Sequence, residues 1–125
     1  MLKYLELKSG YSGNGPAWIG RVSFSKSKST IYFDGRALKK ISGQGISANY
    51  FDNVSTEEFW VSGVKKNGKD RLDSNASIMI MEDAVAEYLA FGNLTTLDSS
   101  RYKITQQTRQ IDIAKFVEIE NQPLK

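Results

Sequence analysis

Turn signals recur every 8–12 residues along the first 80 residues of this chain, and they divide it into short segments rich in β-branched and aromatic residues. Asp34-Gly35 and Asn67-Gly68 are strong signals, because tight hairpin turns need residues that tolerate a positive φ. Short segments at this spacing are typical of small barrels and sandwiches rather than of parallel α/β sheets. The pattern predicts a mainly β (β-rich α+β) fold: a small SH3-like or related barrel of five to seven antiparallel strands with one or two helices.

Period-two alternation of side chains identifies the individual strands. It is clearest in residues 17–25, where Trp18, Val22 and Phe24 share one face of the predicted strand. The other segments predicted as strands are residues 4–7, 30–33, 36–41, 46–51, 58–64, 76–81 and 101–105.

One helix is predicted at about residues 82–91, where Val85, Tyr88 and Leu89 form an apolar stripe behind an acidic first turn. We therefore expect a barrel-like domain in residues 1–93 and a C-terminal extension, residues 94–125, packed on the same domain. Within the extension, residues 111–120 fit a helix or a strand, with the helix slightly preferred.

The chain contains no histidine and no cysteine. It therefore lacks the usual neutral-pH acid/base side chain, the thiolate nucleophile and the common zinc ligands. Acidic residues cluster at Glu57-Glu58, at Asp70 with Asp73, and at Glu82-Asp83, but neighbours on a strand point to opposite faces and acids at a helix start favour its dipole. We predict no catalytic residue, no metal site and no cofactor, and thus a protein that is not an enzyme.

Two sequence features bear on location. No apolar run approaches the roughly 20 residues that a membrane-spanning helix needs, and residues 1–6 lack the apolar core of a signal peptide. We expect a cytoplasmic protein that does not associate with membranes.

Positive charge is concentrated in the first half of the chain. Residues 1–71 carry a net charge of +6 and residues 72–125 a net charge of −3. The candidate binding residues are the basic and aromatic side chains of the predicted strands and turns: Tyr32, Arg36, Lys39, Lys40, Tyr50, Lys65, Lys66, Lys69 and Arg71, with Trp18 and Trp60 as further aromatic members. The alternative is that the aromatic rings fill the core and that the lysines are solvated or protect sheet edges.

Several segments of residues 1–91 carry a family resemblance. They are residues 14–20 (NGPAWIG), 24–27 (FSKS), 30–33 (TIYF), 45–47 (GIS), 49–52 (NYFD) and 57–68 (EEFWVSGVKKNG), closing at Asp70-Arg71. These segments resemble a family of small uncharacterised bacterial proteins, some of which are labelled 1-deoxy-D-xylulose-5-phosphate synthase. The chain is several times too short for that thiamine-diphosphate enzyme, so the resemblance supports the fold and implies no activity. In the family a histidine follows the Asp-Arg pair, whereas Leu72 stands here.

Three functions are consistent with these features. The leading hypothesis is a non-catalytic module for protein–protein interaction, immunity- or inhibitor-like, whose basic charge suits an acidic partner. The alternative is a small barrel that binds single-stranded nucleic acid on a basic aromatic face. An enzyme is the least favoured, and self-association through an edge strand is compatible with either kind of binding.

Overall fold

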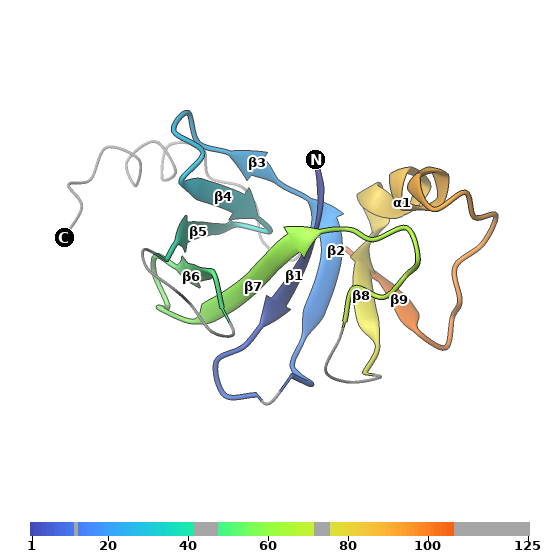
Figure 1. Ribbon diagram of the computed structural model, residues 1–125, viewed down its shortest axis with the longest axis horizontal. Helices are drawn as coiled ribbons and strands as arrows, with labels where there is room; N and C mark the ends of the chain where they lie inside the picture. The colour runs from blue at the N-terminus through green and yellow to red at the C-terminus, as the bar shows by residue number, and fades with distance from the viewer. Residues whose placement is uncertain (12, 42–47, 72–75, 107–125) are drawn as a thin grey trace.

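A computed structural model describes residues 1–11, 13–41, 48–71 and 76–106 (Figure 1). Within this part of the chain there are nine strands, one turn of 3-10 helix and one α-helix. The elements are β1 (Leu2–Leu7), β2 (Ala17–Arg21), β3 (Ser23–Phe24), β4 (Thr30–Phe33), β5 (Arg36–Lys40), β6 (Tyr50–Asp52), β7 (Glu58–Gly63), β8 (Ile78–Met81), η1 (Glu82–Ala84), α1 (Val85–Phe91) and β9 (Tyr102–Thr105).

The sheet curls because the segment that forms β2 and β3 bends at Val22 and pairs with a different strand on each side of the bend. Only Val22 separates β2 from β3; β2 pairs with β1, whereas β3 pairs with β4. From β4 the antiparallel ladder continues through β5, β6 and β7 and returns to β1. The prediction of a mainly β, barrel-like fold is confirmed.

Two features of the sheet differ from the prediction. The described residues form nine strands rather than five to seven, and β8 lies parallel to both β2 and β9. The connection from β8 to β9 runs through α1, and such a helical crossover brings the chain back in the same direction. A purely antiparallel sheet was therefore the wrong expectation for β8 and β9.

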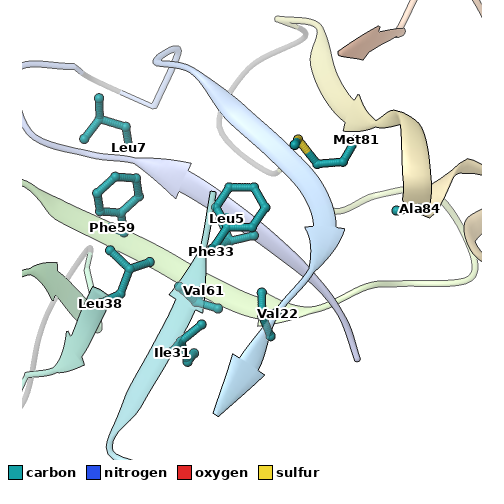
Figure 2. Packing of buried hydrophobic residues seen from close by; sticks show 10 residues of the cluster. All are labelled: Leu5, Leu7, Val22, Ile31, Phe33, Leu38, Phe59, Val61, Met81 and Ala84. Atoms are coloured by element: carbon teal, nitrogen blue, oxygen red, sulfur yellow. The ribbon is translucent and has the colours of Figure 1, made fainter. Parts of the chain in front are cut away.

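The sheet buries apolar side chains on both of its faces. The barrel side holds Leu5, Leu7, Val22, Ile31, Phe33, Leu38, Phe59, Val61, Met81 and Ala84 (Figure 2). The opposite face, together with α1, holds Tyr4, Ala17, Ile19, Ile78, Ile80, Tyr88 and Tyr102. Successive side chains of a strand point to opposite faces of the sheet, so β1 and β8 each contribute residues to both cores.

The predicted helix is present, and its ends have local causes. Residues 82–84 form the 3-10 turn η1, and α1 follows with Tyr88 buried against the sheet. The N–H of Gly92 donates to the Tyr88 carbonyl, and Asn93 takes a left-handed φ of 52° that ends the helix.

The predicted C-terminal extension begins at residue 94, and its described part contributes β9 (Tyr102–Thr105), which pairs with β8. The expectation of a helix or strand at 111–120 concerns residues outside the described part of the chain. The same holds for Asp73 and for residues 46–47 of the strand predicted at 46–51.

Candidate functional site

The structure distributes the candidate binding residues over two regions. Tyr32, Arg36, Lys39, Lys40 and Tyr50 lie on β4, β5 and β6. Both tyrosine rings are half-buried, Lys39 is half-buried, and exposed Lys40 lies opposite Tyr50 in the strand register. These residues belong to the barrel wall.

Arg36 is fixed by two carboxylates. Its Nη1 lies 2.6 Å from Asp52 Oδ2 and 3.2 Å from Glu57 Oε1, and its guanidinium lies 5.3 Å from the centre of the Phe59 ring. Burial by itself raises the pKa of Asp52, but hydrogen bonds from the N–H groups of Val54 and Ser55 and the Arg36 guanidinium lower it below its ordinary value. Arg36 therefore joins β5 to the β6–β7 turn.

Replacing Asp52 with asparagine is expected to reduce the free energy of unfolding by about 2 kcal/mol at neutral pH, since a hydrogen bond between charged groups is lost. Because the folded-state pKa of Asp52 is lowered, its contribution is present above the unfolded-state pKa of about 3.9 and is lost as pH falls through the folded-state pKa. Urea unfolding of both proteins at several pH values measures this. A difference that persists unchanged in acid would contradict the assignment.

The remaining aromatic candidates do not form one exposed stacking surface. Trp18 is half-buried on the barrel side, with ring centroids 6.2 Å from Phe33 and 6.4 Å from Phe59. Trp60 is half-buried and packs against the core on the other face of the sheet. Together with half-buried Tyr32 and Tyr50, they serve packing in the way that small β domains require.

Arg71 is buried rather than available to a ligand. Its Nη1 donates to the carbonyl of Gly13 and its Nη2 to the carbonyl of Gly15, at 3.0 Å and 2.7 Å. The side chain joins the β7–β8 connection to the glycine-rich loop between β1 and β2.

Lys65 and Lys66 line a cleft of about 220 Å³ on the helix side of the sheet. One wall is the lysine loop, residues 65–69; the other is the segment between α1 and β9, residues 92–101. The lining residues are Lys65, Lys66, Asn67, Gly68, Tyr88, Gly92, Leu94, Thr96, Leu97, Asp98, Arg101 and Tyr102. We call this site the cationic cleft.

The lysine loop is held in shape from beneath. The Lys65 N–H donates to Oδ1 of Asp70 at 2.7 Å, the Lys69 N–H donates to Oδ1 of Asn67, and Gly68 takes a φ of 73°. Asp70 is buried, and this burial raises the pKa of its carboxyl group. The loop thereby presents Lys65, Lys66 and Lys69 with exposed side chains, although Lys69 does not line the cleft.

The opposite wall is organised by Asp98. Its Oδ1 accepts hydrogen bonds from the N–H and the hydroxyl of Ser100, while its carbonyl accepts from the N–H groups of Arg101 and Tyr102. Nη2 of Arg101 donates to the carbonyl of Gly68 at 3.1 Å, so this side chain connects the two walls. The hydrogen bond from the Ser100 side chain lowers the pKa of Asp98.

Two tyrosines form the floor of the cleft. The Tyr88 hydroxyl donates to that of Tyr102 at 3.0 Å, and the ring centroids are 5.6 Å apart. Burial, followed by the hydrogen bond to Tyr102, raises the pKa of Tyr88 far above its usual value. The two rings therefore close the bottom of the cleft with their hydroxyl groups paired.

The chemistry that the cleft offers is attraction of anions. Lys65, Lys66 and Arg101 contribute three positive charges against the single negative charge of Asp98. Lys66 also places its ammonium group 5.6 Å from the centre of the Phe91 ring. Among the described residues there is no group of three side chains that could hold a metal ion.

The candidates that the sequence indicates include two residues of this cleft, Lys65 and Lys66, on one of its walls. They do not include Arg101, Tyr88 or Tyr102. Arg101 lies 33 residues beyond Gly68, and no periodicity links the two positions. The basic residues of the predicted strand at 101–105 were the only available signal.

Comparison with protein-family models, curated proteins and solved structures finds no match for this chain. The resemblance to the small bacterial family therefore stays a prediction. In the described part of the chain, no helix has the length and apolar character needed to cross a membrane.

Proposed function

We propose that this protein is a non-catalytic binding module that holds an acidic segment of a partner protein in the cationic cleft. The observation that carries the proposal is the convergence of Lys65, Lys66 and Arg101 from two distant segments onto one cleft. Side chains of one sign that line a concave surface raise the local concentration of oppositely charged groups.

The apolar surroundings of the cleft favour a protein partner over a nucleic acid. Phe91, Leu94 and Ile104, from the same part of the chain as the cleft, are 38%, 47% and 59% exposed. Such side chains suit the mixed apolar and charged surface of a peptide. Base stacking would need several accessible rings, but Tyr88 and Tyr102 are buried and the exposed Phe91 ring already contacts the ammonium group of Lys66.

An immunity- or inhibitor-like role is the form of this proposal that suits a small chain of 125 residues with a β-rich fold. The partner would carry an acidic surface, because like charges across an interface repel. The cytoplasm is the proposed location.

Reversing the charges of Lys65 and Lys66 is expected to weaken the binding of an acidic peptide. A labelled decaglutamate serves as the probe, and fluorescence anisotropy measures its affinity. We expect Lys65→Glu/Lys66→Glu to weaken binding at least tenfold, because both attractive charges become repulsive.

Lys26→Glu/Lys28→Glu is the matched control. It changes the net charge equally, on exposed residues of the β3–β4 connection away from the cleft. We expect it to weaken binding far less than the cleft variant. Equal losses in the two variants would show that only net charge matters, and tighter binding of a decathymidine oligonucleotide would favour nucleic acid instead.

A further inference from the structure

The strand beside the cationic cleft lies at the end of the sheet. In the strand order β9 is last, and among the described residues it pairs with β8 alone. Figure 1 shows β9, in orange, on the side of the molecule away from β4 and β5. An edge of this kind presents backbone groups that can pair with another chain.

The register of β8 and β9 identifies those backbone groups. The N–H of Ile78 donates to the carbonyl of Arg101, and Ile78 is the register partner of Tyr102. In a parallel ladder this places the backbone groups of residues 101, 103 and 105 toward β8 and those of Tyr102 and Ile104 toward the free edge. The N–H of Tyr102 already donates to the carbonyl of Asp98. Within the part of the chain that the structure describes, this leaves the Tyr102 carbonyl and both backbone groups of Ile104 for a partner.

The side chains along this edge specify the chemistry of a partner. Tyr102 and Ile104 share one face of β9; Tyr102 lines the cationic cleft, and Ile104 is 59% exposed. Arg101 and Lys103 are also exposed, and residues 101–105 contain no acidic side chain. Lys103 disfavours pairing with a second copy of the strand, because like charges on facing strands repel.

We propose that the acidic partner segment binds as an additional β-strand on β9, pairing with the backbone of Tyr102 and Ile104. Facing residues of neighbouring strands share a face. An acidic side chain opposite Tyr102 then points toward Lys65, Lys66 and Arg101, and an apolar side chain opposite Ile104 covers it. This inference rests on the proposed function and adds the conformation and the side-chain pattern of the ligand.

The test uses two labelled peptides of nine residues, each with threonine at the odd positions and two glutamates and two valines at the even positions. The glutamates precede the valines in one peptide and follow them in the other. One face of each peptide then carries acidic and apolar residues two positions apart, and the two orders cover parallel and antiparallel addition. The control peptides carry N-methyl groups at alternate residues, in either phase, which remove backbone donors and keep every side chain.

We expect one of the two orders to bind tighter than decaglutamate and to lose at least tenfold in affinity on N-methylation in one phase. On the protein, Ile104→Pro removes an outward N–H and is expected to cause a comparable loss. Ile104→Thr keeps the N–H and is expected to cause a smaller one. Circular dichroism confirms that both variants are folded, and the N-methylated peptides test the same hydrogen bonds on the unaltered protein.

Four outcomes would overturn the proposal. N-methylated peptides that bind as well as their parents would show that charge alone holds the ligand, and the proposed function would stand. If decaglutamate binds and neither alternating peptide binds tighter, charge alone again holds the ligand, and the proposed function again stands. A dimer that Ile104→Pro dissociates in gel filtration would assign the edge to a second copy. If no acidic peptide binds at all, the proposed function fails as well.

Discussion

Replacing Arg71 with methionine is expected to lower the free energy of unfolding by about 3–5 kcal/mol, the cost of removing one partner from a buried charged network. Arg71 is 7% exposed and donates to the carbonyls of Gly13 and Gly15. Its Nη1 also lies 4.0 Å from Oε2 of buried Glu6. Methionine fills a similar volume but satisfies neither carbonyl and leaves Glu6 with less compensating charge.

Urea unfolding of the full chain measures this loss. A second variant, Glu6→Gln, removes the charge of the carboxylate that lies next to Arg71 in the same network. Glu6 also accepts a hydrogen bond from Tyr4 and lies 2.9 Å from the ammonium group of Lys8. Because Glu6 and Arg71 belong to one network, the effects of the two substitutions should not add in the double variant. A loss below about 1 kcal/mol for Arg71→Met would contradict the structural role that we assign to it.

Replacing Gly15 with alanine is expected to destabilise the fold by about 3 kcal/mol, at the upper end of the usual cost of overpacking. A Cβ atom at this position would lie 2.6 Å from the backbone oxygen of Leu7 and 2.7 Å from the ring of Tyr11. Tyr11 can rotate, but the Leu7 oxygen belongs to the chain leaving β1. Any backbone shift also disturbs the Gly15 carbonyl that Arg71 binds.

Gly63→Ala is the control for this substitution, because a Cβ atom at Gly63 meets nothing within 4 Å. Thermal unfolding followed by circular dichroism compares the two variants under the same conditions. We expect a large decrease in the melting temperature for Gly15→Ala and almost no change for Gly63→Ala. Similar melting temperatures for the two variants would show that the loop adapts to the added methyl group.

The local signals in the sequence predicted the strands well because turns and alternation are local properties. Asp34-Gly35 joins β4 to β5 as expected, with φ values of 48° and 75° at its two residues. Asn67-Gly68 also forms a tight turn, but only Gly68 has a positive φ and the turn does not connect paired strands. Instead, β7 pairs with β1 and β6, and β8 pairs with β2 and β9.

The parts of the cleft that the sequence does not indicate, the wall at residues 92–101 and the tyrosine floor, depend on contacts between distant residues. The parallel crossover through α1 brings Arg101 to Gly68 and packs the Tyr102 ring against the tilted ring of Tyr88. No periodicity in the sequence relates the two residues of either contact. The positive charge of Arg71 was equally misleading, because its position after a lysine-rich turn resembles that of a surface residue. Its burial depends on carbonyl groups of a loop more than 50 residues earlier.

Mapping the binding surface by NMR tests the central claim most directly. Amide resonances of the isotope-labelled chain are followed while the preferred alternating acidic peptide is added, at about 50 mM and about 200 mM salt. The account predicts shifts confined to residues 65–69 and 92–105, with weaker binding at the higher salt concentration. Shifts concentrated on β4, β5 and β6, or no shifts at the lower salt concentration, would contradict it.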